Sequence, residues 1–332
     1  MKIAIIGATG LVGRKMVEKL GSSFISRDAE VFLAASEKSY GKEFFLQGKT
    51  LKVSSIENVL EQKPHIALFS AGNWVSEKYA REFVRQGAFV IDNSSYWRMH
   101  DDVPLVVPEI NSENITSKTR LIANPNCSTI QMVLVLSGLH KAWCIRRIVV
   151  ATYQSVTGTG VRALNQLMNE RTGMIVSEPA YPHTIDLNLF PHGGNFLPNG
   201  YTTEEMKLVN ETRKILHDNQ LQVTATVVRV PIKGGHSEAV NVEFVEDYDI
   251  DDALEILRNT PGVVVQDSPS EDIYPMPLTA EGKDEVFVGR IRHDESCRKA
   301  LNLWIVADNL LKGAATNAVQ IAEYIVNRKY IQ

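Results

Sequence analysis

Short apolar runs alternate with amphipathic segments through the first 125 residues of the chain. The apolar runs are typical of buried strands, and the amphipathic segments are typical of helices. We predict strands at Lys2–Ile6, Glu30–Ala35, His65–Ser70, Ala88–Asp92 and Leu121–Ala123, and helices at Leu11–Leu20 and Val75–Gln86. This alternation favours βαβ units, so we expect a doubly wound, Rossmann-like parallel sheet with helices on both faces.

The pattern changes after residue 127. We predict strands at Arg147–Gln154, Gln222–Val230, Ser237–Val245, Val286–Arg292 and Leu301–Val306, and helices at Ile130–Leu139, Val161–Thr172, Glu204–His217, Asp252–Arg258 and Leu310–Asn327. The period of two in Ser237–Val245 is typical of a half-buried antiparallel strand. Pro179–Gly200 is rich in proline and glycine, which indicates a long loop. We therefore expect a second, α+β domain with a mostly antiparallel or mixed sheet.

Composition narrows the class of protein. The 332 residues are 44% hydrophobic, which suits about two soluble domains. The net charge of −4 comes without a basic block, so nothing indicates nucleic-acid binding. No apolar run approaches the roughly 18 residues of a membrane span, and the first strand is too short for a signal peptide. Three cysteines argue against a disulfide framework, and no His/Cys cluster has zinc spacing, so we expect a cytoplasmic protein without a metal.

One cysteine lies between a predicted strand and a predicted helix, in the segment Asn124–Thr129. Pro125 ends the strand, and Ser128 or Thr129 can cap the helix. Backbone N–H groups at a helix N-terminus favour a thiolate, which is the nucleophilic form of cysteine. The segment therefore predicts a nucleophile at Cys127, with a small buried side chain as the alternative interpretation.

A glycine-rich segment follows the first predicted strand and opens the first predicted helix. It runs from Gly7 to Gly13 with the spacing G-x-x-G-x-x-G. Glycines at such a turn let the backbone approach a pyrophosphate, which the helix N-terminus also attracts. The segment predicts a dinucleotide site that includes Gly7, Thr9, Gly10, Leu11, Val12 and Gly13. A tight turn without a ligand is the alternative.

The residues after the second predicted strand bear on the choice of cofactor. NAD enzymes usually carry an acidic residue there for the ribose 2′-OH. Here Ser36, Lys38 and Ser39 could hold a 2′-phosphate instead, which favours NADP. Glu37 is the exception, because its carboxylate could serve NAD.

Several polar residues of the second half stand at the ends of predicted strands and helices. Arg229 is flanked by valines, so its charge should bind a carboxylate of protein or substrate. His236 follows two glycines and suits acid–base chemistry. Glu204 and Lys207 are three apart on one predicted helical face, either as a surface ion pair or as groups for a zwitterionic substrate. Gln154 could orient a carbonyl or the thiol.

These segments together resemble the aspartate-β-semialdehyde dehydrogenase family, in the branch found in many bacteria. The resemblance covers nearly the full chain, and N-P-N-C-S-T with G-H-S-E carries most of its specificity. The matching segments are Gly7–Gly13, Phe69–Gly72, Asp92–Ser95, Pro108–Asn111, Asn124–Thr129, Tyr153–Gln154, Phe190–His192, Arg229–Pro231, Gly235–Glu238 and Asp308–Ala315.

The resemblance implies roles for individual residues. Cys127 would be the nucleophile, His236 the acid–base catalyst, and Gln154 would help to place the substrate. Arg229 would bind the substrate α-carboxylate and Glu204 its α-amino group. Phosphate would be bound by Arg98, Lys207 and Asn126. Further cofactor contacts would come from Ser70, Ala71, Gly72, Gly158 and Asn309.

The implied reaction is the reversible, NADPH-dependent conversion of L-aspartyl-4-phosphate to L-aspartate-4-semialdehyde and phosphate, through a thioacyl intermediate on Cys127. It belongs to lysine, threonine, methionine and diaminopimelate biosynthesis. The resemblance also implies a discontinuous NADP-binding domain (residues 1–126 plus 311–332), a catalytic and dimerisation domain (127–310), and a homodimer or homotetramer.

Asn73 and Trp74 depart from the small residues often found at their positions in this family, and a tryptophan there could reshape the nicotinamide site. Two rival interpretations stay open. An N-acetyl-glutamyl-phosphate reductase shares the chemistry but needs no acid such as Glu204 for a free amine. A non-catalytic relative is disfavoured by the joint presence of the predicted catalytic residues.

Overall fold

The computed structural model describes residues 1–331, and the chain divides into two compact units. Unit 1 contains Met1–Asn126 and the C-terminal segment that begins at Ala314. Unit 2 is the intervening segment Cys127–Gly313. Among residues 1–331, no helix is long and apolar enough to cross a bilayer.

Unit 1 is built on a seven-stranded sheet with the order β3-β4-β2-β1-β5-β6-β7. Its strands are β1 (Lys2–Ile6), β2 (Glu30–Ala34), β3 (Glu43–Leu46), β4 (Lys49–Ser54), β5 (Ile66–Phe69), β6 (Phe89–Asp92) and β7 (Leu121–Ala123). All neighbouring strands are parallel except β3 and β4. The predicted Rossmann-like architecture is therefore confirmed, and five of the strands coincide with the predicted ones to within one residue at each end.

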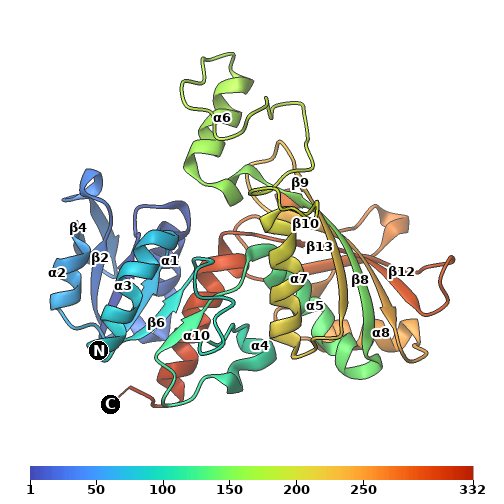
Figure 1. Cartoon of the computed structure of the whole chain (residues 1–332), viewed down its shortest axis with the longest axis horizontal. Helices are drawn as coiled ribbons and strands as arrows, with labels where there is room; N and C mark the ends of the chain where they lie inside the picture. Colours follow the sequence, from blue (N-terminus) through green and yellow to red (C-terminus); the bar gives the residue numbers. More distant parts are fainter. Residues whose placement is uncertain (332) are drawn as a thin grey trace. The chain divides into compact units, whose positions relative to one another are not determined.

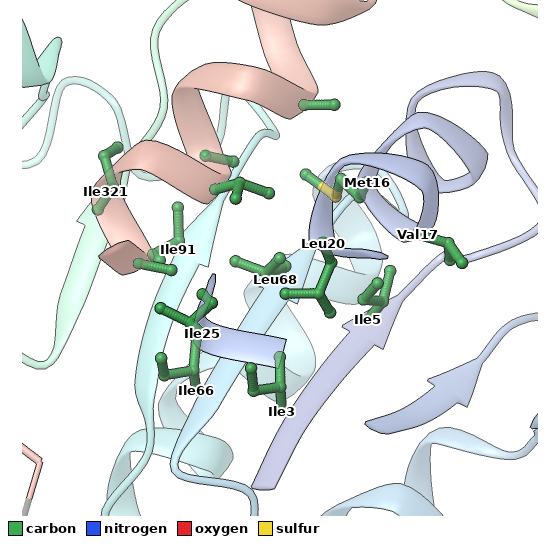
Figure 2. Packing of buried hydrophobic residues seen from close by; sticks show 14 of the residues in the cluster. Ile3, Ile5, Met16, Val17, Leu20, Ile25, Ile66, Leu68, Ile91 and Ile321 are labelled. Atoms are coloured by element: carbon green, nitrogen blue, oxygen red, sulfur yellow. The ribbon is translucent and has the colours of Figure 1, made fainter. Parts of the chain in front are cut away.

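Helices cover both faces of this sheet (Figure 1). They are α1 (Leu11–Ser22), α2 (Ile56–Glu61), α3 (Asn73–Arg85), α4 (Pro108–Asn111) and α10 (Thr316–Asn327), with short 3₁₀ turns at Phe24–Ser26, Glu37–Ser39 and Ser112–Asn114. Figure 2 shows α1 and α10 packing on Ile3, Ile5, Ile66, Leu68 and Ile91. On the opposite face, Phe83 of α3 contacts Phe69 edge-on. Because both faces are buried, these strands are almost purely apolar.

The hairpin β3–β4 is absent from our sequence prediction. Its two-residue turn consists of Gln47 and Gly48, with φ of 47° and 78°. Two positive φ values are typical of a type I′ hairpin turn. The hairpin residues are mostly exposed, so they lack the apolar run on which the prediction of the other strands relied.

Unit 2 contains a six-stranded sheet with the order β11-β12-β13-β10-β8-β9. Its strands are β8 (Ile145–Gln154), β9 (Gln222–Arg229), β10 (His236–Phe244), β11 (Val263–Val265), β12 (Val286–His293) and β13 (Ala300–Ala307). The pairs β8–β9 and β11–β12 are parallel and the other pairs are antiparallel. This is the mixed sheet that the sequence predicts.

The helices of unit 2 lie mostly on one face of its sheet, although one short helix packs on the other face. They are α5 (Cys127–Trp143), α6 (Val161–Arg171), α7 (Thr203–Leu216), α8 (Ile250–Asn259) and α9 (Pro277–Ala280), with 3₁₀ turns at Val156–Thr159 and Pro269–Glu271. Helices α5, α7 and α8 pack on the sheet, whereas α6 and the segment after it extend beyond the strands (Figure 1). The opposite face carries half-buried side chains that include Tyr153, Ala239 and Trp304.

The last predicted helix consists of two parts in the structure. A π-helix at Leu311–Ala315 precedes α10. One face of this segment packs in the core, because Ala315, Ala318, Val319, Ala322 and Ile325 are all buried. Val326 is only partly buried at its edge.

Candidate active site

Three buried polar side chains lie in one row across neighbouring strands of unit 2. In the antiparallel pairing of β10 with β8, His236 lies opposite Gln154. In the parallel pairing of β8 with β9, Gln154 lies opposite Arg229. Opposed residues on neighbouring strands share a face of the sheet. The structure thus brings together three predicted site residues from distant parts of the sequence, and they are only 0%, 1% and 5% exposed.

Cys127 is the first residue of α5. Ser128 and Thr129 therefore lie within the first helical turn, and the prediction that one of them precedes the helix as its cap is wrong. Ser128 Oγ instead accepts a hydrogen bond of 3.0 Å from Gln154 Nε2. This bond ties the residue after the thiol to the polar row.

Gly313 packs against Cys127 from the π-helix. A Cβ atom placed on Gly313 would lie 2.7 Å from the Cβ of Cys127 and 3.2 Å from its Cα. Real Cβ atoms essentially never come within 3.0 Å of another heavy atom. Only glycine therefore lets the π-helix backbone approach the cysteine this closely. π-Helical turns of this kind are frequent at functional sites.

The hydrogen bonds of His236 define how its ring is protonated. Its Nδ1 accepts from the backbone N–H of Ser155 at 3.2 Å, so in the neutral ring the proton belongs on Nε2. Complete burial and, to a smaller extent, the positive charge of Arg229 lower the pKa of His236 to about 3. His236 is therefore neutral near pH 7. In this state, its Nε2 is a hydrogen-bond donor rather than a proton acceptor.

Asn309 connects the ends of several strands around His236. Its Oδ1 accepts hydrogen bonds from Ser155 Oγ at 3.1 Å, Thr157 Oγ1 at 3.3 Å and Gly235 N at 3.1 Å. The side chain is 2% exposed. The structure thus shows a bracing role for Asn309 within unit 2, and its predicted contact with a cofactor stays a prediction.

Arg229 is oriented by the backbone and by a ring. Its Nη1 donates to Ser155 O at 2.6 Å, and its guanidinium lies 5.8 Å from the centre of the Tyr181 ring. No carboxylate among residues 1–331 pairs with it, which leaves its positive charge for a ligand. Gly158 lies alongside, because a Cβ there would be 3.0 Å from Arg229 Nη1 and 2.9 Å from His236 Nε2. The predicted cofactor residue Gly158 therefore borders the polar row.

Two adjacent glutamates at the start of α7 have different surroundings. Glu205 forms a capping box with Thr202 and also accepts from Val227 N at 3.0 Å, so its carboxylate has a structural role. Glu204 accepts from Lys207 Nζ at 2.6 Å, and both side chains remain partly exposed. Glu204 therefore forms the predicted ion pair and still faces solvent, where a charged substrate group could reach it.

In unit 1, the glycine-rich turn after β1 has the geometry of a phosphate-binding loop. A Cβ on Gly7 would lie 2.2 Å from Ser70 O, and one on Gly13 would lie 2.0 Å from Gly7 O. Gly10 caps α1 without a side-chain hydrogen bond. Thr9 Oγ1 lies 3.2 Å from the hydroxyl of Ser39. The close packing and the helix N-terminus fit a dinucleotide pyrophosphate.

The predicted cofactor-selecting residues follow β2 directly. Ser36 and Lys38 are exposed, and so is Glu37, whereas the side chain of Ser39 is buried. Ser36 and Lys38 therefore fit a 2′-phosphate, and Glu37 is equally able to reach a ribose hydroxyl.

The loops after β5 and β6 hold the other predicted residues of unit 1. Arg98 is 7% exposed and donates to Asn93 O at 2.8 Å, so it is a buried side chain held by the loop backbone rather than a solvated one. Gly72, with φ of 84°, precedes α3. Asn73 Oδ1 accepts from the backbone and hydroxyl of Ser95, and Trp74 is 67% exposed. Asn126, 6% exposed, is the last residue of unit 1.

Our sequence reasoning missed several residues of the site. Gly313 lies in a matched motif, but nothing in the sequence indicates its packing on Cys127. The backbone N–H of Ser155 orients the His236 ring. Ser155 follows Gln154 directly, so its position next to a predicted site residue could have indicated it. Tyr181 comes from the long loop and reaches Arg229 only through tertiary packing. Among residues 1–331, no group of three or more His, Cys, Asp or Glu side chains could hold a metal ion.

The chain matches two sequence profiles that together span most of its length. Residues 2–118 match the semialdehyde dehydrogenase NAD-binding domain, and residues 136–312 match the semialdehyde dehydrogenase dimerisation domain. The two profiles fall within units 1 and 2, respectively.

Similar proteins carry one enzyme name. The aspartate-semialdehyde dehydrogenase of Aquifex aeolicus is 47% identical over 99% of both chains, and that of Campylobacter jejuni is 48% identical over 97% of this chain and 96% of its own. The crystal structure of aspartate semialdehyde dehydrogenase II from Vibrio cholerae matches with a TM-score of 0.94 at 44% identity, over 99% of each chain. A second structure of that enzyme, described as complexed with ASA, matches with a TM-score of 0.93 at 43% identity.

Proposed function

Because this chain belongs to the aspartate-semialdehyde dehydrogenase family, we propose that it catalyses the reversible, NADPH-dependent conversion of L-aspartyl-4-phosphate to L-aspartate-4-semialdehyde and phosphate. The chain is thus an oxidoreductase of the semialdehyde dehydrogenase class. One observation carries the proposed chemistry. The row formed by His236, Gln154 and Arg229 is hydrogen-bonded, through Gln154, to the residue that follows Cys127.

Cys127 is the proposed nucleophile. Its thiolate attacks the C4 carbonyl carbon of aspartyl phosphate, an S–C bond forms, and the phosphate leaves with the electron pair of the broken C–O bond. The product of this step is a thioacyl group on Sγ. The position at the start of α5 supports this role, because a helix N-terminus stabilises a thiolate.

His236 is proposed to act at the carbonyl oxygen. The nicotinamide cofactor, when bound, supplies the hydride that the thioacyl group needs in the biosynthetic direction. Negative charge then develops on the former carbonyl oxygen, and the Nε2–H of a neutral imidazole can donate a hydrogen bond to it. Collapse of the resulting thiohemiacetal breaks the S–C bond and returns the thiolate of Cys127. The Ser155 N–H on Nδ1 keeps the proton on Nε2 throughout.

Charged residues are proposed to hold the substrate. Arg229, buried and without a protein carboxylate, suits the α-carboxylate, where a planar guanidinium can bind both oxygens. Glu204 suits the α-amino group. We propose that Arg98, Lys207 and Asn126 bind phosphate. Such groups contribute orientation, whose loss can slow a reaction severely.

The cofactor is proposed to be NADPH, held by Gly7, Thr9, Gly10, Leu11, Val12 and Gly13, with Ser36 and Lys38 on the 2′-phosphate. Ser70, Ala71, Gly72, Gly158 and Asn309 are proposed as further contacts. The close approach of Gly7 to Ser70 supports including the loop after β5. Trp74, which is exposed, is proposed to limit the space beside the nicotinamide.

Two copies of the chain are proposed to pair through the sheet face of unit 2 opposite to α5, α7 and α8. Half-buried Tyr153, Ala239 and Trp304 give this face an apolar centre, and residues 136–312 match a dimerisation domain. A tetramer would need a second interface. We propose that the enzyme works in the cytoplasm, in the biosynthesis of lysine, threonine, methionine and diaminopimelate.

The decisive experiment compares Cys127→Ala with Cys144→Ala as a matched control. The assay follows phosphate-dependent NADP reduction with aspartate semialdehyde, with NAD and N-acetylglutamate semialdehyde as parallel arms. We expect Cys127→Ala to abolish turnover and Cys144→Ala, at an exposed cysteine, to retain it. Substantial turnover by Cys127→Ala would contradict the covalent mechanism. A preference for the acetylated substrate would indicate an N-acetyl-glutamyl-phosphate reductase.

A further inference from the structure

A second row of polar side chains lies next to the first, on the same face of the unit 2 sheet. Glu238 is two residues beyond His236 on β10, and its partner across β8 is Thr152. Residues two apart on a strand share a face, so Glu238 lies next to His236. Both Glu238 and Thr152 are completely buried. Nothing in the proposed mechanism uses either side chain.

Several polar atoms in and beside this second row have no hydrogen-bond partner among the described residues. Among the described residues, neither carboxyl oxygen of Glu238 has a partner at hydrogen-bonding geometry, nor does Oε1 of Gln131 or Oγ1 of Thr152. Gln131, which is also completely buried, approaches Glu238 from α5. A carboxylate and an amide oxygen are both acceptors, so an ionised Glu238 would leave both unsatisfied. A single proton on Glu238 satisfies both, because its O–H can donate to Gln131 Oε1.

Among residues 1–331, no positively charged side chain compensates the charge of an ionised Glu238. The elements packed against it contribute Ile305 of β13, Thr152 of β8, and Ser128 and Gln131 of α5. The nearest titratable group on its own strand is His236, which is neutral in this site. Burial raises the pKa of Glu238 well above its usual value, and the nearness of Gln131 and Ser128 offsets only part of this rise.

We propose that Glu238 is a positioning residue, kept as a neutral carboxylic acid, that fixes the first turn of α5 against the strand that carries His236. The hydrogen bonds run in one consistent direction. Glu238 donates to Gln131 Oε1, and Gln131 Nε2 donates to His236 O at 3.3 Å. Ser128, which lies next to Glu238, accepts from Gln154 Nε2 through its Oγ.

This network sets the orientation of two amides. With its oxygen held by Glu238, Gln131 must present its NH₂ group to His236. With its NH₂ group held by Ser128, Gln154 must direct its oxygen elsewhere. Glu238 therefore decides which end of Gln154 a substrate meets, without touching the substrate itself. The inference rests on the proposed function for its kinetic consequence, but the protonation of Glu238 can be measured without any turnover.

The kinetic test uses Glu238→Leu and Glu238→Gln, with Glu243→Gln as a control at a half-buried position further along β10. Leucine removes the network, so we expect kcat to fall at least about tenfold while KM changes less than about threefold. Glutamine can donate and accept as a neutral acid does, so it should restore kcat to within about threefold of the wild-type value. An equal loss of kcat in Glu238→Leu and Glu238→Gln would overturn the proposal, because an amide that can donate and accept as a neutral acid does would then not restore the rate.

The protonation test compares the unfolding equilibrium of the wild type and Glu238→Gln between pH 5 and 8. A folded-state pKa above the unfolded value of 4.5 stabilises the fold at low pH, and this contribution is lost as the pH rises towards the folded pKa. As the pH rises, the wild type should therefore lose stability relative to Glu238→Gln, and the ratio of the wild-type unfolding constant to that of the variant should rise by up to about tenfold per pH unit. The same ratio for Glu243→Gln should show no such trend.

Infrared spectra give a second readout of the protonated acid. A carboxylic-acid carbonyl band at pH 7 should be present in the wild type and Glu243→Gln and absent from Glu238→Gln. Parallel pH curves, or no band specific to Glu238, would overturn the proposal even if Glu238→Leu fails to fold. Failure of the proposed function is distinguishable, because the wild type would then lack semialdehyde turnover while both of these readouts remain valid.

Discussion

Replacement of Gly158 by alanine would place one methyl group against two residues of the polar row. The new Cβ would lie 2.9 Å from His236 Nε2, 3.1 Å from His236 Cε1 and 3.0 Å from Arg229 Nη1. Gly158 does not have a left-handed φ, so alanine introduces no backbone strain. The substitution therefore acts on the two side chains rather than on the fold of the turn.

The size of the effect follows from these distances. Ordinary contact begins at 3.4 Å, so the closest pair must separate by 3.4 − 2.9, about 0.5 Å. Because His236 is completely buried, the site itself must absorb this displacement. Misplacement by about 1 Å can slow a reaction about 100-fold, so half of that predicts a loss of roughly tenfold in kcat. Overpacking should destabilise the protein by about 1–3 kcal/mol.

Initial rates with aspartate semialdehyde, phosphate and NADP test this expectation. The matched control is Gly234→Ala, whose Cβ would lie 3.5 Å from the nearest atom, a side-chain atom of Glu281, and which should stay within about twofold of the wild type. A normal kcat for Gly158→Ala would refute the claim that the row depends on this space. A selective rise in the KM for NADP would instead support the predicted contact of Gly158 with the cofactor.

Three further predictions concern other parts of the site. Gly313→Ala would place a Cβ 2.7 Å from that of Cys127, so kcat and the rate of thiol alkylation should both fall about tenfold or more; unchanged rates of both would refute the packing argument. The pKa of His236 is about 3 in the folded protein against 6.5 for a free side chain, so the stability it confers is present above pH 6.5 and is lost as the pH falls towards 3. At about 1.4 kcal/mol per unit, this loss is at most roughly 5 kcal/mol, and chemical denaturation of His236→Asn should show a flatter pH dependence. Glu204→Gln should raise the KM for the semialdehyde with a smaller change in kcat, whereas Glu205→Gln should mainly lower thermal stability, by about 1 kcal/mol; the reverse pattern would contradict the assignment of the two glutamates.

The fold was predictable wherever burial leaves a clear pattern in the sequence. Strands such as Lys2–Ile6 and Leu121–Ala123 are buried on both faces and match their predicted bounds. The exposed hairpin β3–β4 carries no such pattern and depends on a two-residue turn with Gly48. The π-helix at Leu311–Ala315 was also not predictable, because its five residues form a single turn and are too few to show a period of their own.

The candidate site was predictable in its residue types but not in its arrangement. Cys127, Gln154, Arg229 and His236 were chosen from local motifs, yet their common row depends on which strands pair and in what register. The tautomer of His236 depends on one backbone N–H across that register. Such contacts join positions far apart in the sequence, and no local pattern encodes them.

The two rows of polar side chains on the unit 2 sheet differ in charge, and each charge state suits substrate binding. The first row combines neutral His236 with the charged Arg229, whose guanidinium has no carboxylate partner among the described residues. An uncompensated buried charge is costly in the free protein, and a substrate carboxylate removes that cost on binding. The second row, around Glu238, must then remain uncharged, because an anion there would compete electrostatically with the substrate for Arg229. Binding of a substrate carboxylate therefore requires both the cation of Arg229, which has no carboxylate partner among the described residues, and a neutral acid at Glu238. We expect substrate binding to stabilise unit 2 against unfolding.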